Sequence, residues 1–124
     1  MIDFQNASFV KLRETNPADY DNVVRPLLIP GESVATAFRG MRDGVVFTNK
    51  RVIVINVQGM TGKKKDLTSL PYTKIQAFSI ETSGVMDLDS ELELWFSGLG
   101  KVRLEFTGGC NIVALGNFLS QFVL

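Results

Sequence analysis

The chain has 124 residues, of which 13 are basic and 13 acidic, and it contains one cysteine and no histidine. The balanced charge excludes an overall positive field, so nucleic acid is not an expected partner and an anionic membrane would need a local basic patch. Without histidine, Ser-His and Cys-His catalysis and every His-ligated metal site are excluded, and we expect neither a cofactor nor a bound metal ion.

The length fits a single domain with one hydrophobic core. Within it, residues 1–30 are interpreted as an N-terminal helical lead-in and residues 31–124 as the main domain. Cys110 has no partner for an internal disulfide, and residues 1–15 lack the basic cluster and apolar run of a signal peptide. These features predict a cytoplasmic protein. The most apolar stretches fall short of the about 20 residues that a membrane-spanning helix needs.

A short helix is predicted near the N-terminus. Asn16 before Pro17 is typical of an N-cap followed by proline at the first helical position, and Asp19 places a negative charge in the first turn. Pro26 limits the length of this helix. The residues before Asn16 follow no single pattern, and their conformation is left open.

From Ser33 onward the pattern predicts one strand after another. A turn at Asn49-Lys50 predicts a hairpin in which Val46 lies opposite Ile53. Both faces of this hairpin are apolar, so one face belongs to the core and the other needs a cover. We therefore assign Val46, Ile53 and Ile55 to a candidate interface between subunits.

Two further strands follow the hairpin, one ending at Pro71 and one over residues 74–82, with a bulge expected near Gln76. The clearest alternation runs over residues 86–96 and predicts a half-buried strand with an acidic outer face. A three-residue loop at Gly98-Leu99-Gly100 would lead into the returning strand.

The chain is predicted to end in a helix. Asn111 is a candidate cap, and the apolar residues after it recur at helical spacing: Ile112, Leu115, Leu119 and Phe122. Phe118 and Val123 lie off that stripe, so the helix is apolar over more than one face. We add Phe118 and Val123 to the candidate interface between subunits.

Seven strands followed by one C-terminal helix is the order of elements in a pleckstrin-homology-like domain, a mainly β fold of the α+β class. Five motifs occur in order along the chain: Arg42-Asp43 with Val46-Phe47-Thr48-Asn49-Lys50-Arg51, Gln58-Gly59-Met60-Thr61-Gly62-Lys63-Lys64, Leu70-Pro71-Tyr72 with Ile75, Phe78-Ser79-Ile80-Glu81-Thr82, and Asp87-Leu88-Asp89-Ser90-Glu91-Leu92. Together they resemble the bacterial pleckstrin-homology domain family, formerly a domain of unknown function, from about Leu28 to the C-terminus.

The resemblance implies a bent seven-stranded antiparallel sheet, or partly open barrel, capped by the final helix. It further implies a ring-shaped homo-oligomer, with about five subunits for a single-domain member. The family has no established catalytic residues, and its members are inferred to bind proteins on a polar surface formed across adjacent subunits. The resemblance therefore assigns no catalytic residues to this chain.

Basic side chains gather in three predicted loops that share one end of a pleckstrin-homology-like domain. They are Arg39, Arg42, Lys63, Lys64, Lys65 and Lys101. A P-loop is excluded because the Gly-x-x-x-x-Gly-Lys-Ser/Thr spacing is absent. The loops are either a site for an anionic lipid headgroup or ordinary solvated loops.

Acidic residues alternate before and along the predicted strand over residues 86–96. Asp87, Asp89 and Glu91 could collect a hard cation, although they lack the glycine bend of an EF-hand loop. With Trp95 they make a candidate docking surface for a protein, in which an aromatic anchor has polar neighbours. The predicted register sets Arg103 opposite Trp95 and adds it to this surface, unless the tryptophan only stacks on the arginine.

The same register sets Glu93 opposite Glu105, which raises the alternative of a paired-carboxylate hydrolase. An open strand face offers no reason for a raised pKa there, so we expect no enzyme activity. The sequence favours a non-enzymatic scaffold that assembles into a homo-oligomeric ring and binds an unidentified protein partner. The alternative is peripheral binding of an anionic lipid through the basic loops.

Overall fold

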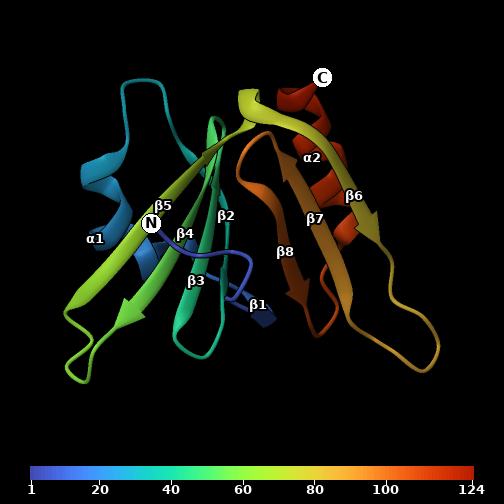
Figure 1. The fold of residues 1–124 in the computed structure, drawn as a ribbon, viewed down its shortest axis with the longest axis horizontal. Helices are drawn as coiled ribbons and strands as arrows, with labels where there is room; N and C mark the ends of the chain where they lie inside the picture. Colours follow the sequence, from blue (N-terminus) through green and yellow to red (C-terminus); the bar gives the residue numbers. More distant parts are fainter.

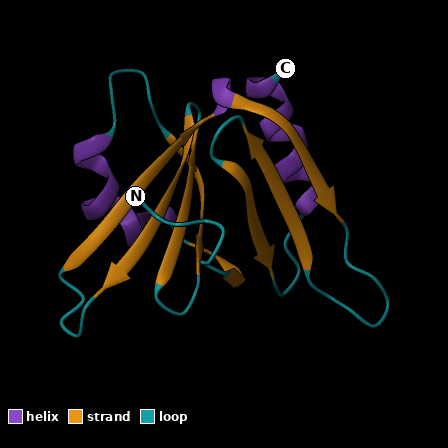
Figure 2. Cartoon of the chain, viewed as in Figure 1, coloured by secondary structure: helices purple, strands orange, loops and turns teal.

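The computed structural model describes all residues, 1–124, as eight strands with short helical turns and one C-terminal helix (Figures 1 and 2). The elements in chain order are β1 (Phe9–Thr15), η1 (Pro17–Tyr20), α1 (Asp21–Val24), η2 (Arg25–Leu27), β2 (Val34–Arg39), β3 (Asp43–Thr48), β4 (Arg51–Gln58), β5 (Lys64–Pro71), η3 (Tyr72–Lys74), β6 (Ile75–Glu81), β7 (Ser90–Phe96), β8 (Gly100–Phe106) and α2 (Ile112–Val123). The strands form one sheet in the order β5-β4-β3-β2-β1-β8-β7-β6. The predicted class, a bent sheet followed by a C-terminal helix, is confirmed.

Strand β1 lies in the segment whose conformation the sequence leaves open. It pairs antiparallel with β2 and parallel with β8, so it joins the two halves of the sheet. Phe9 and Leu12 are its buried residues, and the register with β8 shifts between them at a bulge where Lys11 has a φ of 55°. This bulge spaces the buried side chains three apart and hides the strand from a search for period-two alternation. Residues 1–30 are thus not helical throughout, and the sheet has one strand more than the seven predicted.

The predicted N-terminal helix is present as a helical segment over residues 17–27, built from η1, α1 and η2. The Asn16 side chain accepts a hydrogen bond from the amide of Ala18 at 3.0 Å, and Pro17 occupies the first position, as the sequence predicts. Tyr20 and Val24 are the buried residues of this segment. These two side chains pack the helical segment against the outer face of the sheet.

The β3–β4 hairpin has the predicted register, with Val46 opposite Ile53. One face of the hairpin faces the main core, and the other forms a second, smaller cluster with the helical segment 17–27. Val46, Ile53 and Ile55 belong to this second cluster and are at most 1% exposed. Their assignment to an interface between subunits is therefore wrong: the cover that the apolar face needs comes from the same chain.

Strand β6 contains the predicted bulge, because its register with β7 shifts between Ile75 and Ala77. Strand β7 starts at Ser90, later than the alternation over residues 86–96 predicts. Met86 and Leu88, the apolar residues at the start of that alternation, are 96% and 70% exposed in the connection between the two strands. Here the Asp87 carboxylate and carbonyl accept hydrogen bonds from nearby amides, a local arrangement that competes with strand pairing.

The β7–β8 hairpin differs from the predicted register by two residues. Its loop consists of Ser97, Gly98 and Leu99, and Gly100 already pairs with Phe96. A loop placed one residue earlier moves every opposed pair by two positions, so side chains keep their face but change their partners. Trp95 therefore lies opposite Lys101 and not opposite the predicted arginine.

Helix α2 begins at the predicted cap, where the Asn111 side chain accepts a hydrogen bond from the amide of Ala114 at 3.0 Å. Its stripe of buried residues packs against the main core. Phe118 and Val123, the two residues predicted to lie off this stripe, are only half-buried and also pack against the core. The ring of Phe118 meets that of Phe122 in a T-shaped contact at 5.0 Å between centroids.

Candidate functional site

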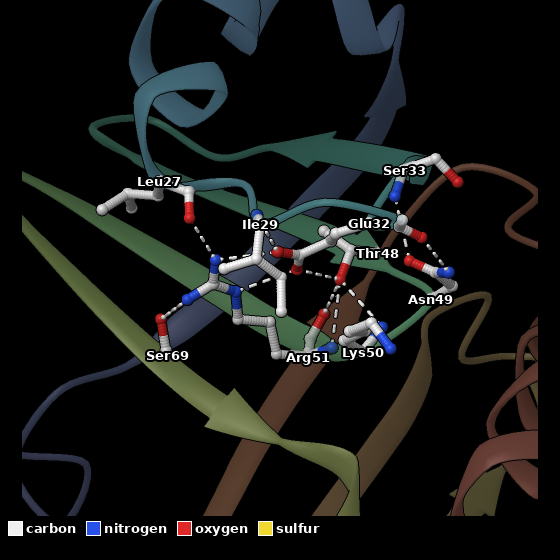
Figure 3. A network of polar contacts seen from close by, with 10 residues as sticks. Leu27, Ile29, Glu32, Ser33, Thr48, Asn49, Lys50, Arg51 and Ser69 are labelled. Atoms are coloured by element: carbon white, nitrogen blue, oxygen red, sulfur yellow. Dashed lines mark hydrogen bonds and ion pairs between the residues drawn. The ribbon is translucent and has the colours of Figure 1, made fainter.

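The most densely bonded polar group in the molecule surrounds Glu32, just before β2 (Figure 3). Its carboxylate accepts hydrogen bonds from Arg51 Nε and Nη2, both at 2.9 Å, and from Thr48 Oγ1 at 2.7 Å. The arginine also donates to the carbonyl of Leu27 and to the hydroxyl of Ser69. This network ties the connection after the helical segment 17–27 to strands β3, β4 and β5.

The Glu32 side chain is fully buried, and burial alone would raise its pKa. Hydrogen bonds from Arg51, Thr48 and the amide of Ile29 outweigh this effect and hold the pKa below its ordinary value. No buried side-chain nitrogen or oxygen lacks a partner anywhere in the structure. The network is thus a structural clamp between elements of the fold, and sequence reasoning, which weighed exposed charges, missed it.

The predicted basic site is only partly assembled. Arg39, Arg42 and Lys65 line one shallow cavity of about 300 Å³ at the end of the sheet where β2 turns into β3 and β4 turns into β5. Lys63, in the β4–β5 connection, and Lys64, at the start of β5, are exposed nearby in the sequence. Arg42 donates to the carbonyl of Gly59 and so links the β2–β3 turn to the β4–β5 connection, whereas Lys65 donates locally to the carbonyl of Gly62.

Lys101 does not join this group. It follows the β7–β8 turn, which Figure 1 shows at the opposite end from the β2–β3 and β4–β5 turns. Its ammonium pairs with Glu93 at 3.3 Å on the outer face of the sheet. The predicted convergence of three loops fails because the half of the sheet that contains β7 and β8 runs in a different direction from the half that contains β2 to β5.

The outer face of β6, β7 and β8 is a lattice of paired charges. Arg103 contacts Glu91 at 2.7 Å and Glu105 at 3.5 Å. The hydrogen bond from Arg103 is the main reason that the pKa of Glu91 lies below its ordinary value. Glu93, predicted to oppose Glu105, lies opposite Arg103 instead, so the two carboxylates do not form the pair that a hydrolase reading requires.

Asp87 and Asp89 lie outside this lattice, in the connection before β7. Trp95 lies near the other end of β7, where its neighbours across the strands are Ala77 and Lys101. The predicted docking surface is therefore divided between two ends of one strand. The structure brings no three acidic or thiol side chains together in a way that could hold a metal ion.

Trp95 is 48% exposed and borders a shallow cavity of about 240 Å³ on the outer face. The small side chains of Ala77 and Ser79 on β6 and the charged side chains of Glu93 and Lys101 also line this cavity. Arg103, the predicted stacking partner, is engaged by carboxylates. An exposed aromatic ring beside small residues and a charged rim can anchor a protein partner.

A third concave region, which sequence reasoning missed, lies between β2 and the start of α2. It has a volume of about 250 Å³ and is mostly apolar, with Phe38, Leu115 and Phe118 among its lining residues. Cys110 also lines it, and burial raises the pKa of this thiol, which disfavours the reactive thiolate. Only the folded arrangement brings these distant residues together, so no local sequence signal could have revealed the groove.

No helix combines the length and apolar character needed to cross a bilayer. The architecture is that of a pleckstrin-homology-like domain: a strongly bent antiparallel sheet, joined here through β1, with a C-terminal helix packed on its core. The model of the bacterial PH domain family matches residues 3–123, and the chain belongs to this family.

Solved structures agree with this assignment. A DUF1696 family protein with a pleckstrin-homology domain from Shewanella loihica PV-4 is 38% identical and superposes with a TM-score of 0.80 over 93% of this chain and 99% of its own. A pleckstrin homology domain from Shewanella amazonensis SB2B is 36% identical, with a TM-score of 0.67 over 96% of this chain and 93% of its own.

Two curated proteins of Bacillus subtilis strain 168 are also similar. The uncharacterized protein YjqA is 53% identical over 72 residues, which cover 58% of this chain and 58% of YjqA. The uncharacterized protein YozO is 38% identical over 68 residues, which cover 55% of this chain and 59% of YozO. The matched region thus spans a little over half the length of each relative.

Proposed function

We propose that this bacterial PH domain is a non-enzymatic scaffold that assembles into a homo-oligomeric ring and binds a protein partner on the outer face of β6, β7 and β8. The observation that carries the proposal is that the sheet does not close. Strands β5 and β6 are its two ends, and neither makes a backbone hydrogen bond to a further strand. Unpaired edges are templates for pairing with another chain.

The two edges differ, which favours a ring over a dimer. Pairing β5 of one subunit with β6 of the next is a heterologous contact, and such contacts generate closed rings when the rotation between subunits permits. The charges fit an antiparallel arrangement. Lys64 and Lys65 begin β5 and Glu81 ends β6, so antiparallel pairing would bring opposite charges together.

The outer face beside β6 supplies the partner surface in this proposal. The cations around Trp95 are already paired within the subunit, so a partner would meet a face of mutually paired charges with one aromatic anchor. Aromatic anchors surrounded by polar rims dominate the energetics of many protein interfaces. A ring would present this face once per subunit and raise the avidity for a multivalent partner.

The assembly is tested by light scattering coupled to gel filtration at micromolar concentration. We expect a mass several times the 13.7 kDa of one chain, stable over a wide range of dilution. Glu81→Lys should lower the mass by placing like charges together, and adding Lys64→Glu and Lys65→Glu should restore it. A monomer mass for the folded wild type would refute the ring. A Glu81→Lys variant that assembles normally would refute the edge pairing.

Anionic lipid binding is the second candidate, and one observation favours it. Met41 and Met60, at the β2–β3 and β4–β5 turns, are fully exposed, and both lie beside the basic residues of these turns. Exposed apolar tips with basic neighbours suit insertion into the headgroup region of an acidic membrane. Acidic liposomes should then sediment the wild type at low salt, less so at high salt, and less after Lys63→Ala with Met60→Ser. If the wild type stays in solution at low salt, this candidate is refuted.

A further inference from the structure

A polar cavity lies between β1, the end of β2 and the residue that follows β8. Its volume is about 350 Å³, and it is lined entirely by polar or glycine residues: Lys11, Arg13, Glu14, Thr15, Arg39, Gly40 and Thr107. Of these residues, the sequence pattern singles out only Arg39, as one of the basic side chains in the predicted loops. The cavity exists because β1, which the sequence did not reveal, places two more cations beside it.

The cations are arranged at an energetic cost. Arg13 on β1 lies directly opposite Arg39 on β2 in the antiparallel register. Like charges in directly opposed strand positions destabilise a sheet. Lys11 precedes Arg13 by two residues on the same strand and has a φ of 55°, a left-handed conformation that a lysine rarely adopts. No ion pair inside the subunit accounts for the placement of Lys11 and Arg13 beside Arg39.

The cations also lack sufficient counter-charges. Lys11 and Arg13 make no ion pair and no side-chain hydrogen bond within the structure. Arg39 contacts Asp19 at 3.4 Å and stacks over the Tyr20 ring, 5.2 Å from its centroid, but Asp19 also accepts a hydrogen bond from the Thr15 hydroxyl. One further carboxylate, that of Glu14, lines the cavity.

The outer face of β6, β7 and β8 provides the contrast. There Lys101 and Arg103 each contact a carboxylate within 3.5 Å. The same chain therefore pairs both cations of the outer face but leaves Lys11 and Arg13, beside the cavity, without an ion pair. Open guanidinium donors at the side of a polar cavity are suited to an anionic ligand.

We propose that the cavity formed by Lys11, Arg13 and Arg39 binds a phosphate-bearing ligand, a phosphomonoester or a diphosphate. A guanidinium group binds phosphate oxygens in a bidentate fork, and the lysine adds a point charge. The Thr107 hydroxyl at the cavity wall is a further donor. A phosphate group has enough acceptor oxygens for all these donors, whereas a single carboxylate does not.

Inorganic pyrophosphate is the probe for this site. Isothermal titration at constant ionic strength should give saturable binding to the wild type, and pyrophosphate should raise its thermal midpoint. Arg13→Gln should weaken the affinity by about tenfold or more. Lys11→Asn should also weaken it, because asparagine tolerates the left-handed conformation while the charge is removed. Lys74→Gln removes one charge from η3, away from the cavity, and should leave the affinity unchanged.

The stability of the unbound variants separates binding from folding. Arg13→Gln removes a like-charge pair, so without pyrophosphate it should unfold at the same temperature as the wild type or higher. A lower midpoint would instead give the cations a structural role and overturn the proposal. Equal pyrophosphate affinity in Arg13→Gln, Lys74→Gln and the wild type, or no saturable binding, would also overturn it.

Vesicles of phosphatidylcholine with phosphatidic acid distinguish the two sources of the phosphate. If the phosphate is a lipid headgroup, vesicle binding should depend on Arg13 and be displaced by pyrophosphate. If the ligand is a free phosphate compound, pyrophosphate binds in an Arg13-dependent manner and the vesicles do not. Both outcomes support the site. Vesicle binding that is independent of Arg13, with no binding of pyrophosphate, refutes it.

Discussion

The two halves of the sheet present opposite kinds of outer face. On β3 and β4 the outer face is apolar and buried beneath the helical segment 17–27. On β6, β7 and β8 the outer face is polar, carries a lattice of ion pairs and remains open around a half-exposed tryptophan. One chain thus completes one half of its sheet by itself and leaves the other half available.

This difference shows how apolar surface should be interpreted in a sequence. An apolar outer face is a strong signal that something covers it, but the signal does not say whether the cover comes from the same chain. Here the cover is a short helical segment only about 20 residues away in sequence. The face that remains open is the one whose charges already satisfy each other, and the variants below test this comparison.

The largest effect is expected from opening the covered face. Ile53 is fully buried beneath the helical segment, and Ile53→Ala leaves a cavity that the backbone cannot close. The free energy of unfolding should fall by about 2–5 kcal/mol. Urea denaturation measures this loss, with Ser79→Ala on the open face as the control for a strand substitution. A loss below about 0.5 kcal/mol would show that the face is not buried in solution.

The second effect concerns the Glu32–Arg51 network, which fixes the connection after the helical segment 17–27 to the β3–β4 hairpin. Glu32→Gln removes the charge that Arg51 faces in a buried network, and at pH 7 this should cost about 3 kcal/mol. The folded-state pKa of Glu32 lies below its ordinary value of about 4.3, so the stabilisation by the ionised form is fully present above that value. It is lost as the pH falls through the folded-state pKa.

The gap in stability between wild type and Glu32→Gln should therefore narrow as the pH is lowered from 5 toward about 3. Urea denaturation at a series of pH values measures the gap, and Asp89→Asn, at a carboxylate in the connection before β7 that makes no ion pair, serves as the control. A gap that stays constant over this range would mean that the Glu32 carboxylate is not the group that stabilises the clamp.

A smaller effect should come from a single methyl group between the cover and the sheet. A Cβ added at Gly44 on β3 would lie 2.5 Å from the ring of Tyr20. Gly44→Ala should force the ring outward and lower the free energy of unfolding by about 1–3 kcal/mol. At Gly84 an added Cβ would approach no atom closer than 3.7 Å, so Gly84→Ala is the matched control. Equal stability of the two variants would show that the helical segment moves freely on the sheet.

The sequence predicts those parts of the fold in which local pattern and structure agree. The caps at Asn16 and Asn111, the turn at Asn49-Lys50 and the bulge near Gln76 all follow from residue types with strong local preferences. Strand β1 could not be predicted from the sequence, because its bulge removes the period-two alternation of buried residues. The β7–β8 register could not be predicted either. Gly98 and Gly100 both have positive φ, so the glycine pattern is compatible with either placement of the loop.

Less of the candidate site could be predicted. The sequence shows which residues are charged, but pairing decides which charges remain available, and pairing depends on register. Arg103 is engaged by carboxylates, whereas Arg13, on an unpredicted strand, is not. The anion site therefore became visible only when the register of β1 and β2 was known.

The smallest effect is expected on the open face. Trp95 is the only tryptophan in the chain and lies half exposed beside Ala77, so Trp95→Ala exposes little new apolar surface. Its free energy of unfolding, followed by circular dichroism, should stay within roughly 1 kcal/mol of the wild type, far less than the loss in Ile53→Ala. A loss above about 2 kcal/mol would mean that Trp95 is part of a core or of an interface already formed in the isolated protein. A small loss would show that folding does not depend on the indole, which is then free to contact a partner.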